Sequence, residues 1–232
     1  MQGTSDEPLL VLVPSPLLGA AVWGPVAEAL RGRGLDAVVA PAMQSAPASP
    51  LAVVGHLLGV LPAGRPLILV PHSNAGLLVP FLTVARPVMA AIFVDARLPP
   101  SSGRVPTAEG TFRDFLEPLA DTNGLLPPWT QWWSDDDLDG LYPTPDARRQ
   151  VEREAPRLPL AYFDAELILP DGWDSQPCAY LAFGETYGAE RADAATRGWP
   201  TAIMPGDHLH MLHDPVGVAE RIVALAARAR RA

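Results

Sequence analysis

Short runs of apolar residues alternate with stretches of helical spacing along most of the chain. The apolar runs predict buried strands at residues 9–13, 37–40, 67–70, 88–94, 179–183 and 201–204. Apolar residues spaced three to four apart predict helices at residues 21–31, 51–61, 76–85, 189–197 and 216–230. Strands that alternate with helices form a parallel sheet covered on both faces. The pattern therefore predicts an α/β fold with a mostly parallel, six-stranded sheet flanked by helices.

The alternation is interrupted between residues 99 and 173. This stretch is irregular and rich in proline and aromatic residues, and it fits amphipathic helices around residues 111–120, 130–141 and 147–155. It joins the fourth predicted strand to the fifth at the carboxyl edge of the sheet, where folds of this class bind ligands. We expect a core of residues 1–98 and 174–232, with residues 99–173 inserted as a helical cap.

The composition limits the possible classes of function. The 232 residues fit one domain, and the net charge of -9 disfavours nucleic acid as a partner. No apolar stretch reaches the ~18 residues of a transmembrane helix, and the first residues do not resemble a secretory signal. Cys178 is the one cysteine, which excludes an internal disulfide and suits a reducing compartment. We expect a cytoplasmic protein with no membrane partner; its oligomeric state is left open.

Residues 67–76 are the most informative segment, because a buried strand leads directly into a serine and then a helix. A serine on such a tight turn has its hydroxyl exposed above the sheet, and the N–H groups of the helix start face developing negative charge. The arrangement predicts that Ser73 is a nucleophile. The same residues also fit a strand followed by an ordinary loop that contains a serine.

A serine hydroxyl becomes a good nucleophile when a base accepts its proton, and histidine is the usual base. The histidines of the chain are His56, His72, His208, His210 and His213. The last three follow the final predicted strand directly and should lie at the same sheet edge as Ser73. We expect the His72 side chain to point elsewhere and His56 to lie in an outer helix. Three closely spaced histidines also suit a metal site, but no second group of ligands accompanies them, so no metal is predicted.

The segments around Ser73 and His208 resemble those of the α/β-hydrolase superfamily, and the resemblance covers nearly the whole chain apart from the cap. Residues 206–209 match the glycine, catalytic histidine and following apolar residue of that superfamily. Residues 213–215 match the opening of its last helix, and the turn at Ser73 resembles its nucleophile elbow. The resemblance implies the α/β-hydrolase fold with a cap, Ser73 as nucleophile, His208 as general base and no cofactor.

The third member of such a site is a carboxylate that orients the histidine. Its commonest position in the superfamily falls in residues 184–187, where Tyr187 stands in place of the usual aspartate. Some members place the acid instead at the end of the strand after the nucleophile helix, which is the position of Asp95. The order Ser73, Asp95, His208 agrees with this fold. Asp95 is our choice; Glu185 is the alternative, and a dyad without an acid is a third possibility.

The loop after the first strand departs from the superfamily pattern. Residues 14–16 are Pro-Ser-Pro and occupy the place of the oxyanion loop. A proline at a donor position has no N–H to offer, so Pro16 cannot help to hold an oxyanion. We expect the donors to be the Asn74 N–H together with the Leu17 N–H or the Ser15 hydroxyl. Loss of one donor typically costs ~10²–10³ in rate.

Aromatic residues gather in the predicted cap. Such clusters are usually simple core, but a cap that covers a catalytic edge also faces the substrate. We expect Trp129, Trp132 and Trp133 to line a substrate pocket, with His210 beside them. An apolar small molecule is the expected ligand.

Three functions follow from these residues. The first is a serine hydrolase that cleaves an ester, thioester or lactone by attack of Ser73. The second keeps the fold but is non-hydrolytic, a lyase or cyclase of specialised metabolism, and is favoured by the Pro-Ser-Pro loop and Tyr187. The third is a non-catalytic ligand-binding protein with an incomplete triad.

Overall fold

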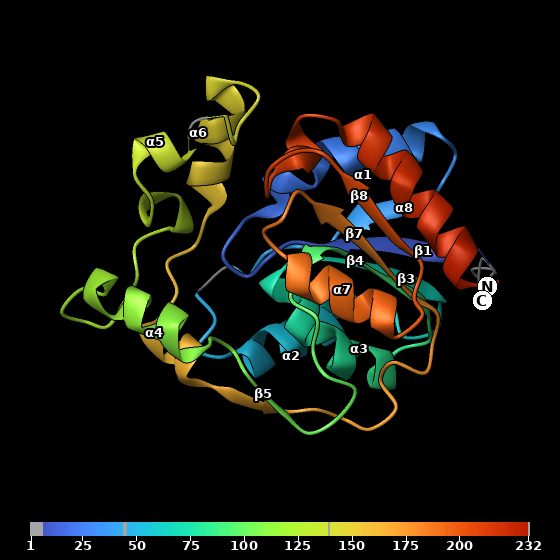
Figure 1. Ribbon diagram of the computed structural model, residues 1–232, viewed down its shortest axis with the longest axis horizontal. Coiled ribbons are helices and arrows are strands. Elements are labelled where there is room, and N and C mark those ends of the chain that lie inside the picture. Colours follow the sequence, from blue (N-terminus) through green and yellow to red (C-terminus); the bar gives the residue numbers. More distant parts are fainter. Residues whose placement is uncertain (1–6, 44–45, 139, 232) are drawn as a thin grey trace.

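The computed structural model describes residues 7–43, 46–138 and 140–231 of the chain. Its centre is a six-stranded parallel sheet with the order β2-β1-β3-β4-β7-β8 (Figure 1). The strands are Leu9–Val13 (β1), Ala37–Val39 (β2), Leu67–Ser73 (β3), Val88–Ala96 (β4), Cys178–Phe183 (β7) and Thr201–Met204 (β8). The predicted α/β class and the six-stranded sheet are confirmed.

Side chains of the central strands alternate between two apolar layers. In β3, Leu67 and Leu69 pack in one layer, and Ile68 and Val70 pack in the other. Successive side chains of a strand point to opposite faces, so a strand covered on both sides needs an apolar residue at nearly every position. This is why the central strands appear in the sequence as continuous apolar runs.

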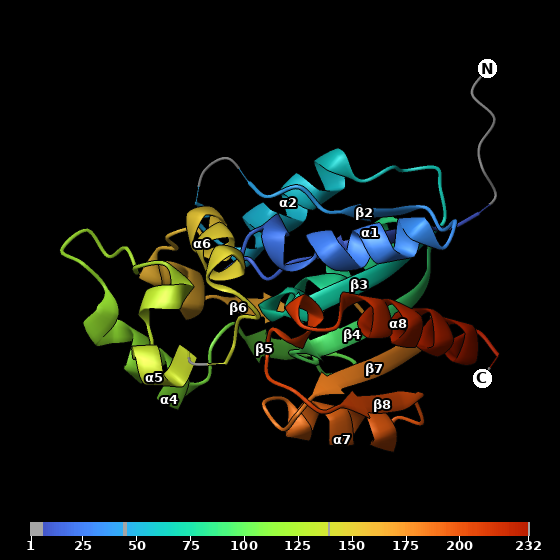
Figure 2. The ribbon, with the colours of Figure 1, turned by 90° about the horizontal axis from the view of Figure 1, so that it is seen from above.

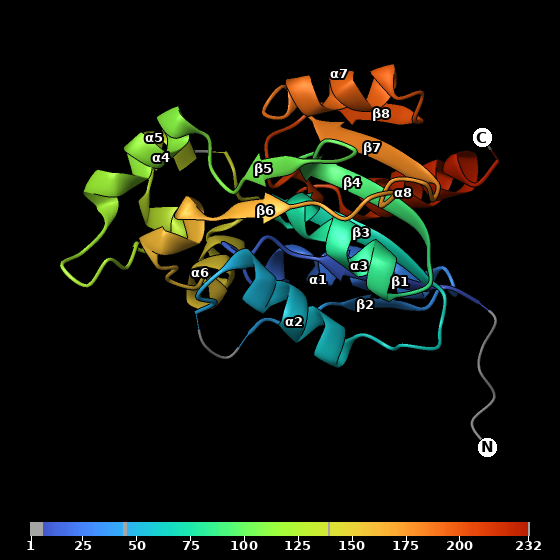
Figure 3. The ribbon, with the colours of Figure 1, turned by 90° about the horizontal axis from the view of Figure 1, so that it is seen from below.

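Helices cover both faces of the sheet. The first face carries α1 (Gly24–Gly32) and α8 (Pro215–Ala229), which pack against each other (Figure 2). The second face carries α2 (Pro50–Val60), α3 (Val79–Ala85) and α7 (Gly188–Thr196) (Figure 3). Within the described ranges, no helix combines the length and the apolar composition that crossing a membrane requires.

Between β4 and β7 the chain leaves the sheet and forms a group of short elements to one side of it (Figure 1). The regular elements of this group are β5 (Arg104–Pro106), α4 (Gly110–Leu116), α5 (Asp135–Leu138), α6 (Pro145–Glu154) and β6 (Glu166–Ile168). We refer to the group as the cap. Glu154, the last residue of α6, fixes one end of the cap to the core, because its Oε2 accepts a hydrogen bond of 2.8 Å from the Ala21 N–H.

The cap departs from the sequence prediction in two ways. A helix over residues 130–141 is wrong: a 3₁₀ turn at Trp129–Gln131 and the short helix α5 stand there, and residue 139 lies outside the described residues. Ser134 starts the new helix, since its Oγ accepts from the Asp137 N–H at 3.2 Å. The second departure is an antiparallel ribbon of β5 and β6 (Figure 3), whose pairing is non-local and three residues long.

Candidate active site

Ser73 ends β3 in a strained conformation. Its backbone has φ 56° and ψ -131°, a region that non-glycine residues rarely adopt and that costs of order 1–3 kcal/mol. The next residue, Asn74, begins a 3₁₀ helix at Asn74–Leu78, so its backbone N–H has no partner within that helix. The carbonyl of Ser73 accepts from the Arg97 N–H at 3.0 Å, which ties the turn to the end of β4. The chain therefore turns sharply at the serine, as the sequence predicts.

Close packing behind the turn requires a glycine. A Cβ at Gly76 would collide with the carbonyl oxygen of Arg97, so no larger residue fits without moving the backbone. Ala75, which stands where the superfamily usually has glycine, is fully buried and fits as it is. The backbone just after β4 thus lies directly against the turn.

Asp95 and His208 come together at this edge. The His208 Nδ1 and the Asp95 Oδ2 lie 2.6 Å apart, and the second oxygen of Asp95 accepts from the Phe183 N–H at 2.9 Å. Asp95 is completely buried, and its backbone is in the left-handed region with φ 41°. With Nδ1 bonded to the carboxylate, a neutral His208 carries its proton there and leaves Nε2 as the basic atom.

Glu185 stands apart from this pair. Its side chain is largely exposed and lies 3.6 Å from Arg191. Of the two carboxylates proposed from the sequence, Asp95 is the one that contacts His208.

Tyr187 contacts the serine directly. Its hydroxyl lies 3.4 Å from the Ser73 Oγ, a long hydrogen bond, and its ring centroid lies 5.6 Å from that of His208. Burial raises the pKa of Tyr187 to about 12, so the phenol stays protonated at neutral pH. Among the described residues, Ser73 Oγ forms no hydrogen bond with His208.

Ser73 and His208 open into one cavity of about 390 Å³, which we call the Ser73 cavity. Its walls are of two kinds. The aromatic wall contains Phe112, Trp129, Trp133 and Tyr187, and the charged wall contains Arg97, Glu109 and Glu190.

On the charged wall, the Arg97 guanidinium lies 3.6 Å from each of the two carboxylates. Burial raises the pKa of the Glu190 carboxyl. The sequence analysis did not identify this wall, because its three residues come from separate segments and none belongs to a recognisable motif.

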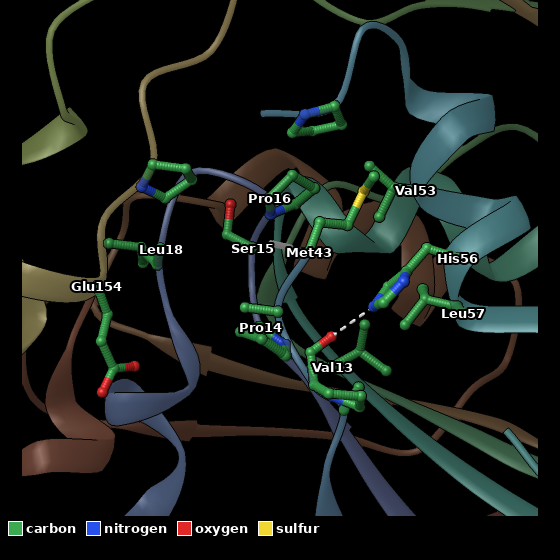
Figure 4. A pocket seen from close by; sticks show the side chains of 15 residues that line it. Val13, Pro14, Ser15, Pro16, Leu18, Met43, Val53, His56, Leu57 and Glu154 are labelled. Carbon is green, nitrogen blue, oxygen red and sulfur yellow. Dashed lines mark hydrogen bonds between the residues drawn. The ribbon is translucent and has the colours of Figure 1, made fainter. Parts of the chain in front are cut away.

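The expected oxyanion donors divide between two cavities. Asn74 and Leu17 line the Ser73 cavity, whereas Ser15 lines a separate, smaller cavity of about 60 Å³ beside the Pro-Ser-Pro loop (Figure 4). Ser15 Oγ lies 3.4 Å from the Leu17 N–H. Ser15, which was expected as an alternative to Leu17, is not among the residues that line the Ser73 cavity.

Two further expected pocket residues are not among those that line the Ser73 cavity. Trp132 lines a hollow that adjoins the Ser73 cavity, and its indole N–H donates to the Pro127 carbonyl at 2.8 Å. His210 lines neither space; a 3₁₀ turn at His210–Leu212 packs its ring 5.4 Å from Phe183 and 6.3 Å from His213. No group of three or more His, Cys, Asp or Glu side chains in the described part of the chain is arranged to hold a metal ion.

His72 does not line the Ser73 cavity, which agrees with the expectation, but its contact with His208 was not predicted from the sequence. Its ring stacks on that of His208 with a centroid distance of 4.4 Å, and its Nε2 lies 3.0 Å from the His208 carbonyl oxygen. The missed signal was its position: residue 72 and Ser73 point to opposite sides of the strand end, and the loop of residue 208 returns over that edge.

No protein-family model matches the chain, and no curated protein matches its sequence. Solved structures match nearly all of it. An extracellular α/β-hydrolase from a Paenibacillus species is 17% identical with a TM-score of 0.71, covering 94% of this chain and 98% of its own. A tomato methylketone synthase I variant complexed with β-ketoheptanoate is 14% identical with a TM-score of 0.70, covering 96% and 99%. A pyrethroid hydrolase from Sphingobium faniae JZ-2 is 16% identical with a TM-score of 0.68, covering 95% and 97%.

At these identities the likeness concerns the path of the backbone. The strand order, the turn at Ser73 and the matches over nearly the full length agree with one another. The chain has the α/β-hydrolase fold.

Proposed function

We propose that the chain is a serine hydrolase that cleaves an ester, thioester or lactone of an apolar small molecule. The observation that carries the proposal is the contact of 2.6 Å between His208 Nδ1 and the buried Asp95, with Ser73 on a strained turn in the same cavity. A base oriented by a buried carboxylate beside a serine of this kind is the arrangement that acyl transfer requires.

In the proposed reaction, Ser73 Oγ attacks the substrate carbonyl carbon and passes its proton to His208 Nε2. The tetrahedral intermediate then collapses, the bond to the leaving group breaks, and His208 returns the proton to the departing oxygen or sulfur. Water attacks the acyl-serine with His208 again as base, which releases the acid and restores the Ser73 hydroxyl. Asp95 keeps its charge and stabilises the imidazolium throughout.

The oxyanion is assigned to the backbone N–H groups of Asn74 and Leu17, two residues that line the cavity. In the resting protein the Leu17 N–H donates to Ser15 Oγ at 3.4 Å, so it has to leave this long bond to bind the oxyanion. In the resting protein, Ser73 bonds to Tyr187 rather than to His208. Catalytic hydrogen bonds are often long or misaligned without substrate, so a shift of Ser73 toward His208 on substrate binding belongs to the proposal.

The walls of the cavity support the choice of substrate. The aromatic residues of the cap suit an apolar body of moderate size. The charged wall of Arg97, Glu109 and Glu190 suits a polar substituent on that body, since both carboxylates lie beyond hydrogen-bond distance of the guanidinium.

The direct test replaces the nucleophile. We expect Ser73→Ala to abolish labelling by a fluorophosphonate probe and to lower the hydrolysis of p-nitrophenyl esters by roughly 10⁴-fold or more. Ser102→Ala changes an exposed serine outside the cavity and should behave as the wild type. Full activity of the Ser73→Ala variant would reject the mechanism.

A non-hydrolytic reaction in the same cavity is the second candidate, and the bond between Ser73 and Tyr187 is the observation that favours it. A neutral phenol beside the serine can hold or donate a proton to a bound substrate without acyl transfer. Under this candidate, the Tyr187→Phe variant no longer carries out the non-hydrolytic reaction, while labelling of Ser73 by fluorophosphonate is retained. Under the hydrolase proposal, the same variant keeps ester cleavage within about tenfold of the wild type, because the Ser73–His208–Asp95 set is intact.

A further inference from the structure

His72 lies directly beneath the histidine of the proposed active site. It is fully buried near the end of β3, and its ring stacks on His208 with an interplanar angle of 29°. The ring of Trp23 lies nearly perpendicular to that of His72, with centroids 6.0 Å apart and an interplanar angle of 83°. His208 is therefore held between several groups: Asp95 at Nδ1, His72 on one face, and the rings of Trp129 and Tyr187 nearby.

The hydrogen bond of His72 fixes its tautomer. Its partner is the backbone carbonyl of His208, at 3.0 Å from Nε2, and a carbonyl only accepts. The proton of a neutral His72 must then be on Nε2, which leaves Nδ1 as a bare acceptor. Nδ1 is buried and finds no hydrogen-bond partner among the described residues.

The environment also selects the neutral form. Burial, more than the neighbouring His208, lowers the pKa of His72 well below its usual value. When His208 takes the proton of Ser73, the new imidazolium then faces a neutral aromatic ring rather than a second positive charge.

We propose that His72 is a positioning residue for His208: it anchors the backbone of the loop that carries His208 and supports the face of its ring, while remaining uncharged itself. The role rests on the proposed hydrolase function. It assigns a task to the residue before Ser73, which otherwise is an unexplained buried polar group.

The first test does not depend on activity. In protein labelled with ¹⁵N-histidine, we expect one imidazole to show the neutral Nε2–H tautomer and not to titrate between pH 8 and pH 5, and His72→Gln should remove that signal. A His72 resonance that titrates in this range, or that reports the Nδ1–H tautomer, overturns the proposal.

The second test separates the two contacts. His72→Gln keeps an N–H donor for the His208 carbonyl and loses the ring, whereas His72→Phe keeps an aromatic face and loses the donor. We expect His72→Phe to lower kcat for a p-nitrophenyl ester by about 10- to 100-fold, with KM within about threefold of the wild type. The loss of kcat in His72→Gln should be smaller, because glutamine keeps the donor.

His56→Gln is the matched control, because His56 also bonds a backbone carbonyl through Nε2, that of Pro41 at 2.9 Å, and lies outside the Ser73 cavity. Folded His72 variants with unchanged kcat, or with a loss confined to KM, contradict the positioning role. If the wild type neither hydrolyses esters nor reacts with fluorophosphonate, the proposed function fails, and the imidazole spectrum still decides the state of His72.

Discussion

Asp95 uses its two carboxylate oxygens for two different purposes. One oxygen contacts the imidazole of His208, and the other accepts the backbone N–H of Phe183 in the neighbouring strand β7. The second bond holds the carboxylate plane, so the first oxygen stays aimed at Nδ1. A buried carboxylate that is satisfied on both oxygens keeps its charge at a lower cost than an isolated one.

Replacing the carboxylate of Asp95 by an amide of the same size should disturb the orientation of His208 without changing the packing. Asp95→Asn preserves the volume but presents an amide to His208, which favours the wrong imidazole tautomer, and we expect kcat for ester hydrolysis to fall by ~10³–10⁴-fold with little change in KM. Glu185→Gln is the control, because Glu185 lies outside the contact with His208. An unchanged kcat in Asp95→Asn, or an equal loss in Glu185→Gln, would contradict the assignment of Asp95 as the partner of His208.

At this scale the sequence predicted positions better than contacts. Ser73, Asp95 and His208 could be named because each lies at or shortly after the carboxyl end of a strand, and the topology brings such positions together. The contacts of His72 and Tyr187 could not be named. They depend on side-chain directions in loops, and a change of one rotamer moves a hydroxyl or ring by several ångströms.

The strands β3 and β4 are locked together where the site is built. Their register places Ser73 beside Ala96, and the close approach of the Arg97 carbonyl leaves no room for a side chain at Gly76. Two consecutive strands therefore meet backbone to backbone behind Ser73.

Adding a methyl group at Gly76 tests how closely the two backbones lie. We expect Gly76→Ala to lower the free energy of unfolding by roughly 3 kcal/mol, because the collision is with backbone and cannot be relieved by a rotamer change. Gly55→Ala is the matched control: Gly55 lies within helix α2 with open space around it, and the change should stabilise the protein by about 0.5–1 kcal/mol. Urea unfolding of both variants gives the comparison, and a Gly76→Ala variant as stable as the wild type would refute the tight approach.

Prediction of the elements succeeded where the sheet is buried on both faces. The apolar runs of the strands and the spacing of α1, α2, α7 and α8 are local signals that tertiary packing reinforces. In the cap, the elements are short and held by distant partners, such as the ribbon that pairs Val105 with Leu167. No local pattern encodes such a pairing, which explains the missed ribbon and the wrong helix at residues 130–141.

For the whole molecule, the buried neutral His72 makes stability depend on pH. The pKa of His72 is lowered in the folded state. Below about pH 6.5, His72 is therefore protonated in the unfolded chain but stays neutral in the folded chain. The contribution of His72 to the free energy of unfolding is therefore complete above about pH 6.5, and it is lost as the pH falls toward the lowered pKa of the folded state.

The measurement compares urea unfolding of the wild type and His72→Gln at pH 7, 6 and 5. We expect the wild type to lose up to about 1.4 kcal/mol more per pH unit than the variant below pH 6, since one proton distinguishes them. If the free energy of unfolding falls equally with pH in the two proteins, His72 has the same pKa in the folded and the unfolded state.

The hydrogen bond between the Arg97 N–H and the Ser73 carbonyl has a consequence for how the protein can be redesigned. Ser73 ends β3 and Asp95 lies in the paired strand β4, whereas Phe112, Trp129 and Trp133 come from the cap. Mutations among those aromatics leave the pairing of the two strands untouched. A library confined to residues 110–133, with Trp129 kept because its ring lies 6.1 Å from that of His208, would therefore sample new ligands beside an unchanged arrangement of Ser73, Asp95 and His208.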